Sequence, residues 1–180
     1  MMKWRPFTFQ GTTYDLSHLD PFDWHYTTEA TDKLTAIKYK FQVTFSMHCF
    51  SRKPLVNEQV TGNMWYPWPR EQRIFCFDRY EFSKQLPDII QDLGGRNCWH
   101  THHGTFFTIE VTTKGVQKTE YEIYFDVTKA TRKGNWLNLV IQSAYERTDA
   151  YASTRPKKRK IRLHVIARNK QQGREVRPAR

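Results

Sequence analysis

Apolar and polar side chains that alternate at every second residue constrain the fold of this chain more than any other feature. From Ile37 to Cys49 the odd positions are apolar or aromatic, and the even positions are polar, from Lys38 to His48. Successive side chains of a β-strand point to opposite faces of the sheet, so this alternation predicts a long, half-buried strand. We expect His48 near the end of the polar face of that strand.

Five further stretches predict strands, and a sixth short strand is expected within "PFTFQGTTYDLSHL". These stretches are "RIFCFDRY", "TFFTIEV", "TEYEIYFDV", "WLNLVIQSAY" and "KIRLHVIARN". The glycine of "TKGVQ" predicts a hairpin between the second and third of them. The predicted buried residues are Phe107, Ile109 and Val111, then Tyr121, Ile123, Phe125 and Val127, then Leu137, Leu139 and Ile141, and finally Ile161, Leu163, Val165 and Ala167.

One stretch, "YEFSKQLPDIIQDLGG", has the spacing of a helix instead. Leu86, Ile89, Ile90 and Leu93 share one helical face, and the two glycines that follow are a common helix stop. Pro87 is expected in the first turn, where its missing N–H is tolerated. We therefore predict an α+β fold, with a mostly antiparallel twisted β-sheet, one main α-helix and aromatic-rich loops.

The charge is distributed unevenly along the chain. Residues 155–180 contain eleven basic residues and one acidic residue, whereas residues 1–154 contain 18 basic and 17 acidic residues. We expect one domain, with a near-neutral α+β body over residues 1–154 and a basic final strand and tail over residues 155–180. Such asymmetry favours a polyanionic partner, usually a nucleic acid, although a solvated tail is the simpler explanation.

Two groups of residues are predicted to bind the nucleic acid. Cations of the last strand and its flanks are expected to hold phosphates, with Arg162, His164 and Arg168 on the solvent face of that strand. Aromatic rings beside a cation in "NMWYPWPR" are suited to stack on unpaired bases, which favours RNA over DNA, unless they only cover the core. The predicted nucleic-acid-binding residues are Arg155, Lys157, Lys158, Arg159, Lys160, Arg162, Arg168, Trp65, Trp68 and Arg70.

The segment "NCWHTHHGTFF" places one cysteine and three histidines within six positions. A structural zinc site commonly takes two closely spaced ligand pairs, but the chain has no C-x2-C pair. His48 and Cys49 are adjacent, and on a strand they would point to opposite faces. We therefore predict no metal site, and a polar loop before a strand remains the simplest explanation of this segment.

Acid–base chemistry is the alternative for the same histidines. Cleavage of RNA through its own 2′-hydroxyl needs a general base, a general acid and a cation, and it needs no metal. Histidine titrates near neutral pH and suits both proton transfers. If the strand ends meet at one edge of the sheet, the predicted catalytic residues are His48, Arg52, Arg79, His100, His102 and His103.

Several segments carry a resemblance to known proteins, among them "YDLSHLDPF", "FSMHCFSR", "RIFCFDRYEFSKQLPDII", "YEIYFDV" and "LNLVIQSAYER". Over roughly residues 14–150 the chain resembles uncharacterised bacterial mobile-element proteins of the stationary-phase growth-adaptation type. That resemblance implies no particular activity. The order of a helix followed by antiparallel strands is similar to small ribonucleases of the barnase and bacterial-toxin type, and this likeness of architecture does not assign function.

The remaining features limit the classes of function. No apolar run approaches the roughly 20 residues that cross a bilayer, and three widely spaced cysteines fit a reducing compartment, so we expect a cytoplasmic protein without membrane contact. No phosphate-binding loop, dinucleotide fingerprint or nucleophile elbow is present, and we expect no cofactor. We predict RNA binding, with metal-independent ribonuclease activity as an extension. The alternative is a protein-interaction module of a prophage or mobile element that docks on an acidic host protein; the oligomeric state stays open.

Overall fold

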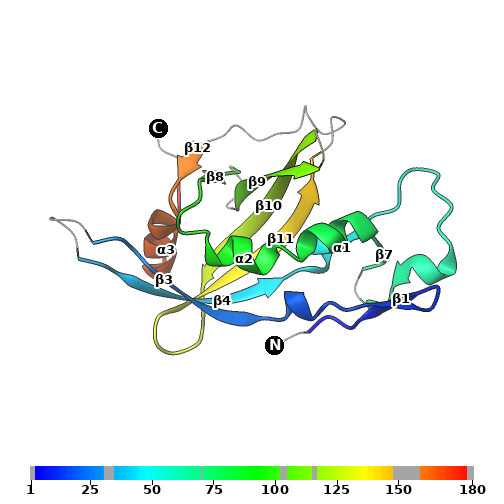
Figure 1. Ribbon diagram of the computed structural model, residues 1–180. Coiled ribbons are helices and arrows are strands. Elements are labelled where there is room, and N and C mark those ends of the chain that lie inside the picture. Colours follow the sequence, from blue (N-terminus) through cyan, green and yellow to red (C-terminus); the bar gives the residue numbers. More distant parts are fainter. Residues whose placement is uncertain are drawn as a thin grey trace.

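A sheet of seven strands forms the centre of the fold (Figure 1). The computed structural model describes residues 3–30, 35–69, 71–101, 105–114, 117–147 and 159–177, and for residues 110–114 and 117–118 it describes the backbone alone. The strand order is β12-β8-β9-β10-β11-β4-β3. The strands are β3 (Phe22–Thr27), β4 (Lys38–Phe45), β8 (Cys98–His100), β9 (Phe106–Lys114), β10 (Gln117–Lys129), β11 (Trp136–Glu146) and β12 (Arg159–Ile161).

Antiparallel pairing dominates this sheet, as predicted, and the one parallel pair joins β4 to β11. The predicted hairpin between β9 and β10 is confirmed, because Lys114 lies opposite Gln117. Strand β4 ends at Phe45, opposite Ile141, whereas β11 continues to Glu146. The last residues of β11 therefore run past the end of β4.

The buried faces of the two long strands agree with the alternation in the sequence. All seven predicted core residues of β10 and β11, from Tyr121 to Ile141, are fully buried. Strand β9 differs, because Phe106 faces Phe125 in the core and Phe107 lies on the other face of the sheet. Phe107 is fully buried there between Trp99 and Tyr124, so both faces are covered and alternation alone could not predict which phenylalanine joins the core.

Two short helices replace the single predicted helix: α1 (Phe77–Ser83) and α2 (Leu86–Gln91). Pro87 lies in the first turn of α2, as predicted. The four apolar residues of the predicted helical face are buried. Gly94 comes shortly after α2 and lies against the ring of Tyr26, so any Cβ at this position would overlap the ring.

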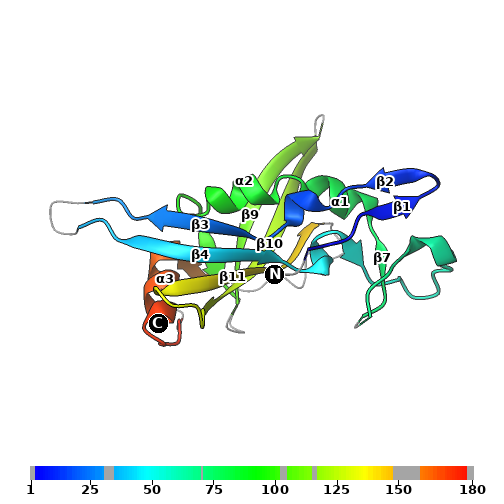
Figure 2. The same cartoon turned by 90° about the horizontal axis from the view of Figure 1, so that it is seen from below.

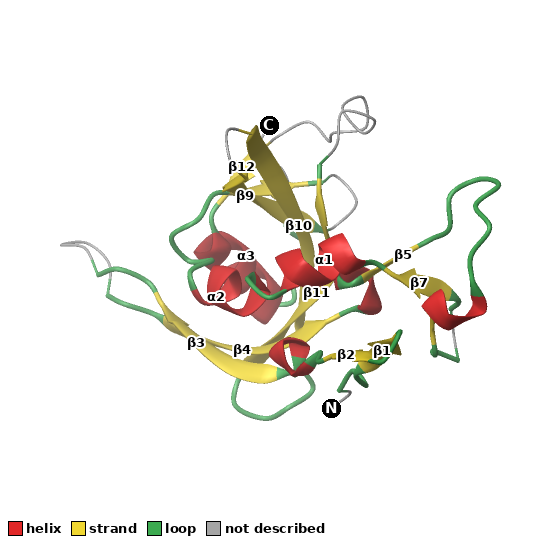
Figure 3. Cartoon of the chain, turned by 45° about the vertical axis from the view of Figure 1, so that its right-hand side comes forward, coloured by secondary structure: helices red, strands yellow, loops and turns green. Residues whose placement is uncertain are grey.

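The predicted final strand is wrong after its first residues. Strand β12 ends at Ile161, and residues 163–171 form α3 (Leu163–Gln171). Leu163, Ile166 and Ala167 are fully buried at helical spacing, whereas Val165 is 37% exposed. The apolar residues of this segment fit both the two-residue period of a strand and the 3.6-residue period of a helix. The helix forms because it packs against β10 and β11. Figure 3 shows the helices between β9, β10 and β12 on one side and β3 and β4 on the other.

Two small sheets complete the fold. The predicted N-terminal strand is a hairpin of β1 (Phe7–Phe9) and β2 (Thr12–Tyr14), turning at Gly11 with a φ of 78°. The second sheet has the order β5-β7-β6, with β5 (Ser51–Arg52), β6 (Trp65–Tyr66) and β7 (Arg73–Phe75). Three-residue 3-10 turns are η1 (Ser17–Leu19), η2 (Met47–Cys49) and η3 (Gly62–Met64). Figure 2 shows β1, β2 and β7 at one end of the molecule and α3 at the other.

The strand that was predicted over residues 37–49 is shorter in the structure, because β4 ends at Phe45. After Phe45 the chain turns through η2, because the Ser46 hydroxyl accepts a hydrogen bond from the backbone N–H of His48 at 3.1 Å. Met47 and Cys49 remain buried in this turn, so it preserves the alternating burial that the sequence suggested. The short β7 ends at Phe75, and Arg79 lies in α1 rather than at the end of a strand.

Candidate functional site

The predicted site residues form two groups, one around α1 and β7 and one around α3, and Figure 2 shows β7 and α3 toward opposite ends of the molecule. His48, Arg52, Arg79, Trp65 and Trp68 lie around η2, α1 and the β5-β7-β6 sheet. The second group lies on β8, β12 and α3, and it consists of His100, Arg159, Lys160, Arg162 and Arg168. His102, His103, Arg155, Lys157, Lys158 and Arg70 lie outside the described residues.

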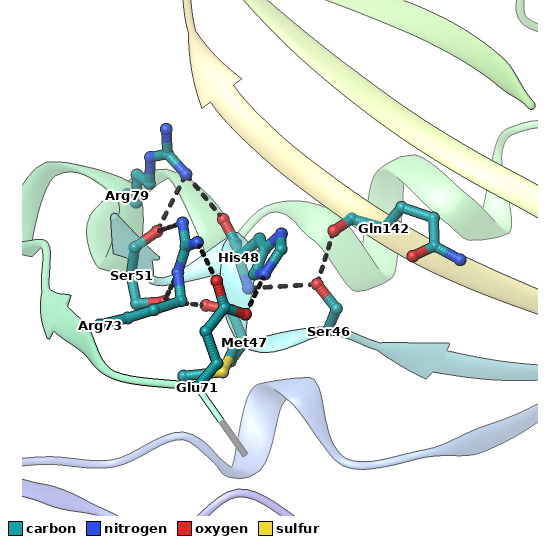
Figure 4. A network of polar contacts seen from close by, with 8 residues as sticks. All are labelled: Ser46, Met47, His48, Ser51, Glu71, Arg73, Arg79 and Gln142. Carbon is teal, nitrogen blue, oxygen red and sulfur yellow. Dashed lines mark hydrogen bonds and ion pairs between the residues drawn. The ribbon is translucent and has the colours of Figure 1, made fainter. Parts of the chain in front are cut away.

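The first end carries a polar network that we call the His48 cluster: Ser46, His48, Ser51, Glu71, Arg73 and Arg79 (Figure 4). The imidazole Nε2 of His48 lies 3.0 Å from Glu71 Oε2, and both side chains are partly exposed. The hydrogen bonds from His48 and then Arg73 lower the pKa of the Glu71 carboxyl. A carboxylate that holds an imidazole in this way orients it for proton transfer.

Arg73 anchors the cluster from β7. Its guanidinium is only 6% exposed and uses three nitrogens: Nε donates to Ser51 Oγ at 3.0 Å, Nη2 to Ser51 O at 3.2 Å, and Nη1 to Glu71 Oε1 at 2.9 Å. The Ser51 hydroxyl in turn donates to Met47 O at 2.6 Å. The antiparallel pairing of β5 and β7 brings these groups together, so Arg73 holds the small sheet against η2.

Arg79 reaches the same cluster from α1. Its Nη1 donates to two backbone carbonyls, His48 O at 3.0 Å and Ser51 O at 2.9 Å. Its guanidinium carbon lies 5.3 Å from the centre of the Tyr145 ring. Burial lowers the pKa of Arg79, because a guanidinium loses hydration when it is removed from water.

Arg52 is bound to a carboxylate that the sequence did not suggest. Both oxygens of Glu58 accept hydrogen bonds from the Arg52 guanidinium, and one of them also accepts from the backbone N–H of Leu55. The hydrogen bond from Arg52 is the main reason that the pKa of Glu58 falls to about 2. The charge of Arg52 is therefore balanced locally.

His100 does not meet His48. It lies on β8, and three strands, β9, β10 and β11, separate β8 from β4. At a strand spacing of about 4.8 Å, four steps across the sheet amount to roughly 19 Å. His100 is buried, its Nε2 lies 2.9 Å from Val176 O, and its ring packs edge-on against Phe106. The predicted meeting of strand ends at one edge is therefore wrong for this histidine.

Two of the three cysteines, Cys49 and Cys98, are buried in the core, and Cys76 is partly exposed. Burial raises the pKa values of the Cys49 and Cys98 thiols to about 12, which disfavours the thiolate that metals and nucleophilic chemistry require. Among the residues that the structure describes, no three histidine, cysteine or carboxylate side chains are grouped to hold a metal ion.

At the other end of the molecule, several cationic side chains are exposed. Four exposed side chains on and after β12 and α3 have no ion pair within the described part of the chain, and we call them the β12–α3 surface: Lys160, Arg162, Arg168 and Arg174. Arg159 and His164 are exposed beside them. The prediction that Arg162 and Arg168 are exposed is confirmed, although they leave from the start and the body of a helix rather than from a strand.

A shallow hollow of about 460 Å³ lies between α2 and β3, lined by Tyr26, Gln91, Asp92, Gly94, Gly95 and Arg96. Burial raises the pKa of Tyr26, and nearby Arg162 opposes that rise. Arg168 acts in the same sense on Tyr39, whose ring stacks with that of Tyr26 at 6.2 Å. Two cations of the β12–α3 surface therefore act on stacked tyrosines of β3 and β4, of which Tyr26 is partly exposed and Tyr39 is buried. Sequence reasoning missed this relation because β3 and β12 lie far apart in the chain.

The predicted aromatic stacking residues lie at the other end. A second hollow of about 300 Å³ is lined by Trp65, Tyr66, Pro67, Trp68 and Gln72. Trp68 packs edge-on against the buried Trp4 at 5.0 Å, so part of its ring covers the core. Trp65 and Trp68 are both half-buried.

A family model matches residues 6–171, nearly the whole chain, and its description is the YjaZ family. The chain belongs to the YjaZ family. Neither the curated proteins nor the solved structures contain a match to it. The family description states no substrate or partner, and the resemblance to mobile-element proteins stays a prediction.

Within the described ranges, no helix has the length and apolar character that crossing a bilayer requires.

Proposed function

We propose that this protein binds single-stranded nucleic acid, RNA in preference to DNA, along the β12–α3 surface. The observation that carries the proposal is the group of four exposed cations that have no ion pair among the described residues. Cations without a neighbouring carboxylate can neutralise backbone phosphates and release the counterions that surround them. RNA is preferred because proteins recognise it chiefly through unpaired bases.

The rigidity of the cations supports binding at this surface. Lys160 belongs to a strand of the main sheet, while Arg162 and Arg168 flank or belong to a helix that is anchored in the core by Leu163 and Ile166. A side chain on a fixed backbone loses less conformational entropy when it binds a phosphate than one on a loose tail. The surface therefore suits a backbone of regularly spaced phosphates.

The proximity of Tyr26 to Arg162 supports a single strand as the ligand. An unpaired base needs an aromatic or planar surface near the phosphate contacts. Tyr26 lines the hollow, and it is near enough to Arg162 for that charge to act on its pKa. A double helix hides its bases and would not use such a hollow. The proposal includes the cytoplasmic location that such a ligand implies.

The proposal is binding without cleavage. His100 is buried and distant from His48, and the other described histidines have different neighbours: His18 contacts Ser83, His25 packs on Trp136, and His164 lies on α3. Cleavage through the 2′-hydroxyl needs an acid and a base on either side of one phosphate. Among the described residues, no second histidine belongs to the His48 cluster.

Charge reversal tests the proposal. The triple variant Lys160→Glu, Arg162→Glu, Arg168→Glu is compared with Lys53→Glu, Lys129→Glu, Lys133→Glu, which makes the same change in net charge at exposed lysines elsewhere. Fluorescence anisotropy with labelled single-stranded RNA at low salt should show about a 100-fold loss of affinity for the first variant and a much smaller loss for the second.

Equal losses in the two variants would overturn the assignment to this surface. Absence of RNA binding by the unmodified protein, together with binding of an acidic peptide, would instead favour the protein-interaction alternative.

A further inference from the structure

The guanidinium of Arg79 uses only part of its hydrogen-bonding capacity. Its Nη1 serves both backbone carbonyls, whereas Nε and Nη2 have no acceptor among the described residues. Neither nitrogen belongs to the described buried polar atoms that lack a hydrogen-bond partner, so both nitrogens are accessible to solvent. Nε–H and Nη2–H form one edge of the guanidinium, and this edge can bind two oxygens of an oxyanion side by side.

The two other arginines around η2, Arg52 and Arg73, differ in this respect. Arg73 uses Nε, Nη1 and Nη2 for Ser51 and Glu71, and Arg52 uses Nη1 and Nη2 for Glu58. In contrast, Arg79 forms no ion pair with any described carboxylate, and its guanidinium carbon lies over the aromatic face of Tyr145. The unused Nε–Nη2 edge therefore distinguishes Arg79 from Arg52 and Arg73.

The electrostatics around Arg79 favour an anion. The His48 cluster contains two guanidinium groups but one carboxylate, Glu71, which contacts Arg73 and His48. Arg79 and Arg73 both donate to Ser51 O, so their positive charges lie close together. A half-buried cation without an anionic partner is costly, because it has lost hydration and gained no opposite charge. An oxyanion at the unused edge would supply that charge.

We propose that the Nε–Nη2 edge of Arg79 is a binding site for a phosphate group. A phosphate carries up to two negative charges and matches the surplus of positive charge better than a single carboxylate does. The phosphate belongs either to inorganic phosphate or to the terminal phosphate of a nucleotide. The site lies on α1, which Figure 2 shows apart from α3, and it does not depend on the proposed RNA binding.

The test titrates the protein with inorganic phosphate and, in separate arms, with uridine monophosphate and uridine, at constant ionic strength maintained with chloride. The Nε–H resonance of Arg79, assigned by its absence in Arg79→Lys, should shift and saturate with at least one phosphate compound and should not shift with uridine. Saturation by both compounds identifies the phosphate group itself as the ligand, and saturation by uridine monophosphate alone identifies a nucleotide.

Calorimetry of Arg79→Lys and Arg79→Gln should show phosphate affinity weakened by about tenfold or more, since the paired charge-assisted bonds are lost. Arg132→Gln removes the same charge from an arginine that is paired with Asp23, and it should bind like the unmodified protein. An Arg79 resonance that does not respond in the folded, unmodified protein would overturn the proposal, as would equal binding by all variants. Either result would leave the proposed RNA binding unaffected.

Discussion

Both ends of the molecule are rich in arginine, but the arginines at one end are bound within the protein and those at the other end are exposed. Around η2, Arg52 and Arg73 are bound to Glu58 and Glu71, and Arg79 holds two backbone carbonyls. On the β12–α3 surface, Arg162 and Arg168 are exposed and meet no carboxylate among the described residues. The comparison teaches that partners, rather than residue type, decide whether an arginine holds the fold together or is available to a ligand.

The largest effect on stability is expected in α3, the helix that joins the exposed cations to the core. Ile166→Asp places a carboxylate at a fully buried position of α3 and should lower the free energy of unfolding by about 3–5 kcal/mol, enough to unfold much of the sample. Val165→Asp, on the exposed side of the same helix, should cost less than about 1 kcal/mol. Chemical denaturation measures both, and similar stabilities would show that α3 is not part of the core.

At the other end, Arg73→Leu should destabilise the protein by about 2–3 kcal/mol, because Ser51 loses two hydrogen bonds in a buried position. RNA affinity should not change. Arg132→Leu breaks a half-exposed ion pair with Asp23 and should cost less than about 1 kcal/mol. If Arg73→Leu weakened RNA binding in folded protein, the division between a structural end and a binding end would fail.

A single neutral substitution sharpens the contrast. Lys160→Gln should weaken RNA binding about threefold at low salt and leave the unfolding midpoint unchanged, because an exposed side chain contributes charge and little packing. Lys53→Gln, also exposed but beside β5, should change neither quantity. Anisotropy titrations of the two variants, run in parallel, would contradict the account if the effects were equal or reversed.

The smallest effect concerns acid stability at the η2 end. The pKa of Glu58 lies near 2 in the folded protein, below its ordinary value of 4.5, mainly because of Arg52. A depressed folded-state pKa stabilises the protein above the unfolded value, and this stabilisation disappears as the pH falls from about 4.5 through 2. Carboxyl NMR titration should show the pKa of Glu58 rising toward 4.5 in Arg52→Gln. An unchanged value would mean that Arg52 is not its partner.

Much of the sheet follows from the sequence because burial imposes a period of two. Tyr121 and Ile123 on β10, and Leu137 and Leu139 on β11, are buried where alternation places them. The α+β class and the antiparallel hairpin follow from the same pattern and from the glycine between β9 and β10. In contrast, the parallel pairing of β4 with β11 joins segments about 100 residues apart, and no local pattern encodes it.

The final segment was predicted wrongly because its apolar residues fit the period of a strand and the period of a helix equally well. Ile161, Leu163 and Ala167 alternate, but Leu163, Ile166 and Ala167 also share a helical face, and only the packed surface of β10 and β11 distinguishes the two. The His48 cluster was missed for a related reason. Glu71 is separated from His48 by 23 positions, and their contact depends on how β7 pairs with β5.

The salt dependence of RNA binding tests the central claim, that the cations of the β12–α3 surface contact phosphates. The logarithm of affinity should fall linearly with the logarithm of salt concentration, and each lost contact to a single strand should reduce the slope by about 0.7. For Lys160→Gln, Arg162→Gln, Arg168→Gln the account predicts a slope smaller than that of the unmodified protein by about 2. Equal slopes for the two folded proteins would contradict it.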